Sequence, residues 1–275
     1  MCYYVDMNKY FNEHTSILVT GASSGIGKCL AELLVNKYHS TVIGVARSKD
    51  KLNAVKTSLG DKFIPLSLDV GEEKSWQEIL NFLSSNDLTL AGIINCAGVL
   101  PKFSSFDGDY FTENESAIKV NFLSVIYSAK YLLPEIQKAE NPVMINVSSS
   151  SALCPFAGIS LYTATKTATQ RFSECLSYEN KKVKVSTVMP GFTKTEVLRS
   201  QTATEKEKGL IDKISAKPEK VANKILRRSS RGKKRIIIGF DAHLMNFLYK
   251  FFPRTAPRLI GWFLRKTKMK IFEKI

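Results

Sequence analysis

Residues 16–27 read SILVTGASSGIG. The first five are apolar or β-branched, a composition typical of a buried strand. Gly21, Gly25 and Gly27 follow, and the residues after them carry apolar side chains at helical spacing. A strand, a glycine turn and a helix in this order let the backbone approach a phosphate group at the helix N-terminus. The glycine spacing is GxxxGxG rather than the GxGxxG fingerprint. The prediction of a phosphate-binding turn therefore rests on the location of the glycines between a strand and a helix.

The alternation of strands and helices continues along the chain. Further strands are predicted at 41–46, 63–68, 88–95, 143–147, 183–188 and 235–238. Helical patterns are predicted at 72–83, 110–137, 162–178 and 217–228. Strands separated by helices indicate an α/β fold with a doubly wound, Rossmann-like parallel sheet of seven strands. Residues 1–239 are expected to form the dinucleotide-binding and catalytic part, and 240–275 a basic amphipathic helical extension of the same domain.

The composition is that of a globular protein with reduced thiols. The 275 residues are 44% hydrophobic, and the five cysteines are scattered without a CxxC pair. The three histidines offer no metal-ligand spacing, so no metal is expected. The first 15 residues lack the apolar core of a secretory signal, and no apolar run reaches the roughly 18 residues that suggest a spanning helix. A cytoplasmic location is the simplest prediction.

The positive charge is concentrated in the last quarter of the chain. The whole chain carries +15, but residues 205–275 hold 20 Lys and Arg against 6 Asp and Glu, a local net charge of +14. Residues 1–204 are close to neutral. The basic character therefore needs a local explanation.

A second polar stretch indicates acid–base chemistry. Four serines, residues 148–151, leave the strand predicted at 143–147, and Tyr162 follows thirteen residues after Ser149. Lys166 comes four residues after Tyr162, so the two share one helix face. A nearby ammonium favours the phenolate and should lower a pKa that starts at about 10. Ser149 could donate a hydrogen bond to the same oxygen. On its own, YxxxK is equally typical of a surface helix.

Arg47 and Ser48 end the second predicted strand. At this position of a βαβ unit an acidic residue holds a ribose 2′-hydroxyl, whereas an arginine accommodates a 2′-phosphate. No acid occurs before Asp50, which is placed to start a helix. The sequence favours NADP over NAD, with a plain solvated Arg47 as the alternative.

Together these residues resemble the short-chain dehydrogenase/reductase family. The likeness spans Ile17 to Gly239 and rests on motifs in a compatible order. These are Thr20-Gly21 with Gly25 and Gly27, Asp69, the Asn-x-Ala-Gly turn at 95–98, Asn121, Ser149, Tyr162 with Lys166, and Pro190-Gly191.

The resemblance implies a role for each matching residue. Tyr162 would be the acid/base, Lys166 would lower its pKa and bind the nicotinamide ribose, and Ser149 would polarise the carbonyl. Asn121 would hold a water molecule. The implied cofactor-binding residues are Gly21, Ser23, Ser24, Gly25, Ile26, Gly27, Arg47, Ser48, Asp69, Val70, Asn95, Ala97, Gly98, Tyr162, Lys166, Pro190, Gly191, Thr193 and Thr195. A homodimer or homotetramer is also implied.

Two departures from the family pattern matter. Cys96 stands where a second Asn is usual, which puts the side-chain hydrogen bonds of that turn in doubt and favours a small buried residue there. The run of four serines assigns Ser149 by spacing alone, and Ser148 or Ser150 is conceivable.

Two later segments bear on substrate and partners. Residues 197–216 are polar and charged, which suggests a mobile lid. Residues 240–275 combine clustered aromatic residues with Lys and Arg, the composition of two short helices that rest on an anionic membrane surface. Packing against the protein's own sheet and a subunit contact are alternatives. Nucleic-acid binding is disfavoured, because phosphate-tracking surfaces do not need so many large apolar residues.

The sequence thus predicts an NADP-dependent oxidoreductase that interconverts a secondary alcohol and a ketone, or an aldehyde, on a steroid-, retinoid- or lipid-like substrate. Two alternatives remain. One is a basic membrane- or nucleic-acid-binding protein with vestigial catalysis on the same scaffold. The other is a reductase of small polar carbonyls.

Overall fold

The structure is a computed structural model that describes residues 7–196, 204–267, 269 and 272. Its strands are β1 Ser16–Thr20, β2 Thr41–Ala46, β3 Phe63–Ser67, β4 Leu90–Asn95, β5 Val143–Val147, β6 Lys184–Pro190 and β7 Arg235–Ile238. Its α-helices are α1 Gly25–Tyr38, α2 Lys49–Leu59, α3 Glu73–Ser85, α4 Gly108–Asn114, α5 Ser116–Ile118, α6 Ser124–Ile136, α7 Ser160–Glu179, α9 Glu205–Ile214, α10 Pro218–Ser230, α11 Phe240–Phe251 and α12 Ala256–Lys266. Short helical turns are η1 Met7–Lys9, η2 Gly60–Lys62, η3 Lys119–Leu123 and η4 Ser150–Ala152.

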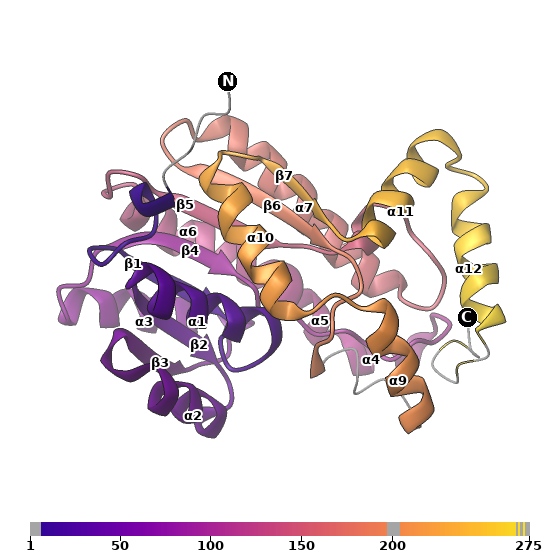
Figure 1. Cartoon of the computed structure of the whole chain (residues 1–275), viewed down its shortest axis with the longest axis horizontal. Helices are drawn as coiled ribbons and strands as arrows, with labels where there is room; N and C mark the ends of the chain where they lie inside the picture. The colour runs from indigo at the N-terminus through magenta and orange to yellow at the C-terminus, as the bar shows by residue number, and fades with distance from the viewer. Residues whose placement is uncertain (1–6, 197–203, 268, 270–271, 273–275) are drawn as a thin grey trace.

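The seven strands form one parallel sheet in the order β3-β2-β1-β4-β5-β6-β7 (Figure 1). The predicted fold class is confirmed. The chain first winds from β1 toward β3 and then returns past β1 to build β4 through β7. The direction of winding reverses between β1 and β4, and ligands of open α/β sheets bind at the carboxyl ends of the strands at such a point.

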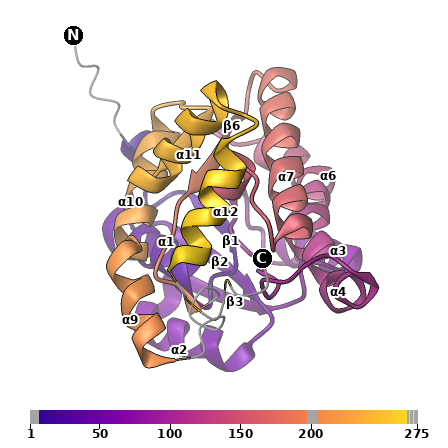
Figure 2. The same cartoon turned by 90° about the vertical axis from the view of Figure 1, so that its right-hand side faces the viewer.

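Helices cover both faces of the sheet, because strands buried on both sides need an apolar layer on each. One core contains buried residues of α1, α2 and α10, and the other contains those of α3, α6 and α7. Figure 2 shows α1 and α10 on one side of the sheet and α3, α6 and α7 on the other.

The helical region predicted at 110–137 is subdivided in the structure. It consists of α4, α5, the π-helical turn η3 and α6. The π turn carries Asn121, and such turns occur frequently at functional sites. A periodicity argument misses a π turn, because one extra residue in a turn barely changes the apolar spacing.

The C-terminal helices form a separate layer beyond the carboxyl end of the sheet (Figure 1). Buried residues of α9, α11 and α12 share a third apolar cluster with loop residues that follow β4 and β5. The two helices expected within 240–275 are therefore present. Of the segment expected to be a lid, residues 205–214 form α9, whose N-terminus is capped reciprocally by Thr204 and Glu207. Residues 197–203 lie outside the described residues.

Candidate active site

The glycine turn is built as the sequence requires. Gly21 and Gly25 have φ values of +69° and +54°, a region that side chains disfavour. A Cβ at Gly21 would lie 2.9 Å from Ala97 Cα, and one at Gly27 would collide with the Gly21 carbonyl oxygen. Only glycine lets β1, the turn and the turn after β4 approach this closely. The N-terminus of α1 faces the resulting crevice, which suits an anionic diphosphate.

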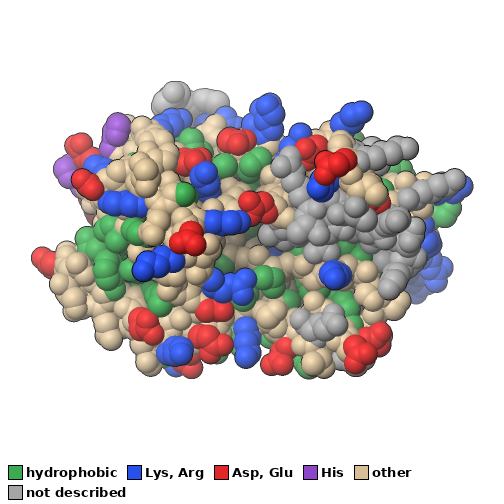
Figure 3. Space-filling view, turned by 90° about the horizontal axis from the view of Figure 1, so that it is seen from below, with side chains coloured by type: hydrophobic (Ala, Val, Ile, Leu, Met, Phe, Trp, Pro, Cys, Tyr) green, Lys and Arg blue, Asp and Glu red, His purple; other side chains and the backbone are tan. Residues whose placement is uncertain are grey.

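Two adjoining cavities open at this crevice. The first lies between the glycine turn, the serine stretch, Tyr162 and the segment 190–195. The second lies toward α2 and includes Ser23, Arg47, Ser48, Asp69 and Val70. Both cavities are bordered by Gly21, Ser24, Ala97 and Gly98. Figure 3, viewed from below Figure 1, shows a hollow on this face with basic and acidic side chains around it. The groups around the two cavities suit a dinucleotide. The glycine backbone and the helix N-terminus lie at one end of the crevice, and exposed cations lie at the other.

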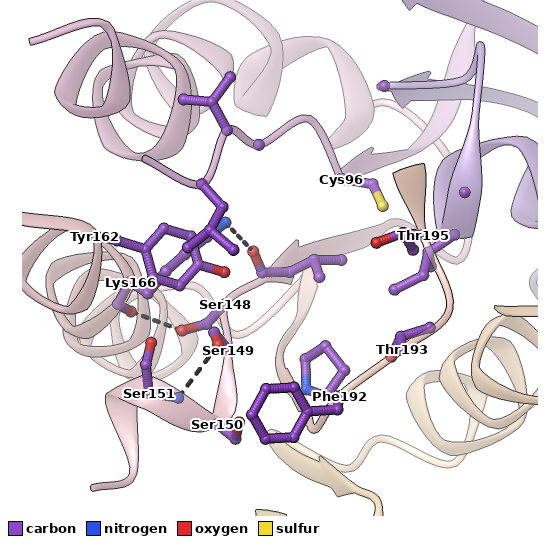
Figure 4. A pocket seen from close by; sticks show the side chains of 18 of the residues that line it. Cys96, Ser148, Ser149, Ser150, Ser151, Tyr162, Lys166, Phe192, Thr193 and Thr195 are labelled. Carbon is purple, nitrogen blue, oxygen red and sulfur yellow. Dashed lines mark hydrogen bonds between the residues drawn. The ribbon is translucent and has the colours of Figure 1, made fainter. Parts of the chain in front are cut away.

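Of the four proposed catalytic side chains, those of Ser149, Tyr162 and Lys166 meet in the first cavity (Figure 4), and Asn121 does not line it. Tyr162 and Lys166 extend from α7, and Lys166 Nζ lies 5.8 Å from the centre of the Tyr162 ring. The Ser149 side chain lines the same cavity and lowers the pKa of the Tyr162 phenol. Lys166 Nζ donates to the Val147 carbonyl oxygen at 3.1 Å.

Among the four serines, the hydrogen bonds distinguish Ser149. Ser148 Oγ donates to the Lys166 carbonyl oxygen at 2.6 Å, so this hydroxyl ties β5 to α7. Ser150 and Ser151 are buried in the short turn η4. Ser149 Oγ accepts from Ser151 N at 3.2 Å, and Ser149 is the serine that lowers the pKa of the Tyr162 phenol. This placement supports the assignment that spacing alone left open.

The pKa of Tyr162 differs from the sequence-based expectation. Burial raises the pKa of this phenol, and the Ser149 hydrogen bond lowers it only in part. Burial also lowers the pKa of Lys166 from 10.5 to about 8. Loss of hydration disfavours both charged forms, and here it outweighs the attraction between ammonium and phenolate. The phenol is therefore protonated at neutral pH, as the acid of a reduction must be.

Asn121 is held against the turn that follows β4. Its side chain donates to the Val99 carbonyl oxygen at 2.9 Å and accepts from Val99 N at 2.8 Å. A Cβ at Gly98 would lie 3.3 Å from both Asn121 Oδ1 and Lys166 Nζ. The glycine therefore brings the backbone of this turn close to the lysine.

Asn95 is the one predicted cofactor-binding residue that borders neither cavity. It is 4% exposed, and its amide nitrogen donates to Ser128 Oγ at 2.7 Å and to Asn146 Oδ1 at 2.8 Å. The side chain at the end of β4 points into the protein, and the assignment of Asn95 to cofactor binding stays a prediction. Its hydrogen bonds instead join β4 to β5 and α6.

Cys96 leaves the adjacent turn intact. Thr20 Oγ1 accepts from both Cys96 N and Ala97 N at 3.0 Å, so the turn is held without an asparagine side chain at 96. Burial raises the pKa of the Cys96 thiol to about 12, which leaves a neutral, unreactive group. The described residues contain no cluster of His, Cys, Asp and Glu that could hold a metal ion.

Sequence reasoning missed the apolar wall of the first cavity. Its members come from loops after β4, β5 and β6, and they pack in the same cluster as α9, α11 and α12. They are Leu100, Phe103, Phe156, Ile159 and Phe192. Large apolar residues in segments without helix or strand periodicity were the available signal.

Comparisons with known proteins show the family of this chain. The sequence model described as short chain dehydrogenase matches residues 15–206. A human very-long-chain 3-oxoacyl-CoA reductase is 30% identical over 196 residues, which cover 68% of this chain and 62% of the human protein. A mouse 3-ketodihydrosphingosine reductase is 28% identical over 247 residues, covering 84% of this chain and 73% of the mouse protein. This chain thus spans less than two thirds of the human reductase.

Solved structures share the fold. A short-chain dehydrogenase from Streptomyces avermitilis superposes with a TM-score of 0.76 at 25% identity, covering 90% of this chain and 95% of the other. A serine dehydrogenase complexed with NADP+ gives a TM-score of 0.73 at 22% identity, with 82% and 94% covered.

Proposed function

The chain belongs to the short chain dehydrogenase family, and we propose that it is an NADP-dependent oxidoreductase that interconverts a ketone and a secondary alcohol on a long, apolar, lipid-like substrate. The observation that carries this proposal is that Ser149, Tyr162 and Lys166 line one cavity, which also has an apolar wall. A binding protein with vestigial catalysis has no need of this arrangement.

The residues divide the work of a carbonyl reduction. NADPH, when bound, supplies the hydride. Tyr162 Oη donates a proton to the carbonyl oxygen, and the Ser149 hydroxyl donates a hydrogen bond to the same atom. Lys166 holds the nicotinamide ribose, and Asn121 positions the turn beside it. The glycine turn would hold the diphosphate, Arg47 and Ser48 the 2′-phosphate, and Asp69 and Val70 the adenine. The nicotinamide would be held by Pro190, Gly191, Thr193 and Thr195.

The substrate class follows from the wall and from the relatives. Phe103, Phe156 and Ile159 are nearly buried and offer no charged group to a substrate tail. The names of two relatives, very-long-chain 3-oxoacyl-CoA reductase and 3-ketodihydrosphingosine reductase, each describe a 3-oxo group on a lipid. We infer a long-chain 3-oxo lipid as the substrate of this chain.

Chain length should therefore control kcat/KM. NADPH oxidation at 340 nm should be at least about tenfold more efficient with a 16-carbon 3-oxoacyl thioester than with its 4-carbon counterpart. Burial of only two methylenes, at about 0.8 kcal/mol each, suffices for this factor. Phe192→Ala should reduce the long-chain preference and leave the short-chain rate within about twofold. A preference for the short substrate would instead favour a reductase of small polar carbonyls.

We further propose that α11 and α12 attach the enzyme to an anionic membrane surface. The residues Phe240, Leu244, Phe247 and Phe251 recur at one face of α11, and they are 43–83% exposed. On α12, Leu259, Trp262 and Phe263 form a similar face, 51–63% exposed. No described helix is both long and apolar enough to cross a bilayer.

In both helices some apolar side chains are covered by the protein and others are exposed. Ala242 and Met245 of α11 and Leu264 of α12 are buried against the protein. Cations flank the uncovered faces: Lys250 Nζ lies 5.5 Å from the Phe251 ring centre, and Lys266 Nζ lies 5.4 Å from that of Trp262. Lysines beside aromatic rings suit the boundary between acyl chains and anionic headgroups, where each cation contributes about 1 kcal/mol.

The attachment lies next to the active site. Asp241, in the first turn of α11, accepts a hydrogen bond from Phe192 N at 2.7 Å, and Phe192 lines the first cavity. A lipid substrate could therefore pass from the bilayer toward the pocket along apolar side chains. The enzyme would be a peripheral protein at the cytoplasmic face of a membrane.

Vesicle co-sedimentation tests this surface. The full chain should sediment with phosphatidylserine-containing vesicles, and binding should weaken sharply with salt because surface charges are screened within about 10 Å at 0.1 M. Replacing both Trp262 and Phe263 by Ser should lower the partition coefficient roughly thirtyfold, since about 2 kcal/mol of apolar burial is lost. Tyr178→Ser, which changes an exposed aromatic residue on α7, should have no effect. A chain that stays in the supernatant but dimerises through these residues would show that a second copy covers them.

A further inference from the structure

One ion pair joins two distant segments across the mouth of the crevice. Lys51 Nζ lies 2.7 Å from Glu196 Oε2, although the residues are 145 positions apart in the sequence. Lys51 is in the first turns of α2, and Glu196 directly follows Thr195. Both side chains are more than half exposed, at 53% and 65%.

The two partners belong to different parts of the crevice. Lys51 borders the second cavity together with Arg47 and Ser48. Thr195, next to Glu196, borders the first cavity and would contact a Cβ at Gly25 at 3.1 Å. Ser48 Oγ accepts from Lys51 N at 3.4 Å, which fixes the backbone of Lys51 beside Arg47. The lysine head group is therefore shared between a carboxylate on one side and the proposed 2′-phosphate position on the other.

We propose that Lys51 is a second specificity-determining cation for the 2′-phosphate, and that Glu196 competes with the phosphate for it. The inference rests on the proposed NADP-dependent function and adds to it. An exposed Lys–Glu pair contributes a factor of about five at most, because water solvates both charges. A phosphate carries more charge than a carboxylate and bonds a cation more strongly. Lys51 therefore exchanges Glu196 for the phosphate, and the exchange releases Glu196.

Binding of nucleotide fragments isolates this exchange from catalysis. The dissociation constants of adenosine 2′,5′-bisphosphate and of 5′-AMP are measured by calorimetry on the full chain. Lys51→Met should weaken binding of the bisphosphate about three- to tenfold, whereas Glu196→Gln should strengthen its binding about two- to fivefold. Both variants should leave 5′-AMP within about twofold. The effect of Glu196→Gln should disappear in the double variant, because the released lysine is then absent.

A matched control lies on the same helix. Lys56 Nζ pairs with Asp61 Oδ1 at 3.1 Å, again at the surface, but neither residue borders either of the two cavities described above. Lys56→Met and Asp61→Asn should leave the dissociation constants of both ligands unchanged. The proposal is wrong if Lys51→Met and Glu196→Gln change the dissociation constants of both ligands in the same direction. The ion pair would then only stabilise the structure. If the unmodified chain binds neither fragment nor NADPH, the proposed function itself fails.

Discussion

Replacing Tyr162 by Phe should lower kcat for carbonyl reduction by roughly 10²- to 10⁴-fold, the range that a positioned general acid contributes. The substitution removes one oxygen atom from a partly buried ring and leaves the packing of the ring in the cavity unchanged. The dissociation constant of NADPH should stay within about threefold, because the phenol acts on the substrate. Stopped-flow turnover and fluorescence titration of NADPH measure the two quantities on the same preparation.

Two companion variants make the result specific to proton donation. Ser149→Ala should reduce kcat less than Tyr162→Phe, because the carbonyl oxygen keeps its proton donor and loses one hydrogen bond. Tyr178→Phe, the same chemical change at an exposed site on α7, should leave kcat unchanged. Substantial turnover by Tyr162→Phe would mean that another residue is the acid.

Arg47→Asp should reverse the cofactor preference. Arg47 is exposed and borders the second cavity. The first acidic residue that follows it in the sequence is Asp50. A charge-assisted contact with phosphate contributes about 1.5–3 kcal/mol, so its loss should weaken NADPH roughly ten- to a hundredfold. The new carboxylate should also repel the phosphate and accept a hydrogen bond from a ribose 2′-hydroxyl, which should favour NADH.

The ratio of the NADPH and NADH dissociation constants is the appropriate measurement. Lys56→Asp introduces the same change of charge on α2 away from the cavity and should alter the ratio only slightly, by an amount that vanishes with added salt. Equal affinities of the unmodified chain for the two cofactors would contradict the assignment of Arg47.

Local patterns were sufficient for the architecture. Short β-branched runs such as 16–20 and 143–147 predicted their strands to the residue, because a strand buried on both faces is apolar throughout its length. Once parallel strands alternate with helices, connections of fixed hand bring the carboxyl ends of all strands to one edge. The turns after β1, β2, β4, β5 and β6 therefore had to converge, and most of the proposed cofactor residues lie in them.

Local patterns were insufficient where a side chain's direction or surroundings mattered. Asn95 lies at a strand end, where a side chain can face either side, and its hydrogen-bond partners Ser128 and Asn146 come from elements far along the chain. The pKa of Tyr162 was expected to fall, since Lys166 was visible in the sequence and the extent of burial was not. Desolvation depends on everything that covers a group, which one helix cannot reveal.

The sequence by itself thus determined the parallel sheet, the glycine turn and the Tyr162–Lys166 pair, because each depends on periodicity or on contacts within a few residues. Only the tertiary structure joined Ser148 to the Lys166 carbonyl oxygen, assembled the apolar wall from three separate loops, and placed Lys51 against Glu196. It also showed that α11 and α12 leave one apolar face uncovered. These features depend on long-range packing of segments that lack periodicity, and no local pattern encodes which distant segment will lie beside them.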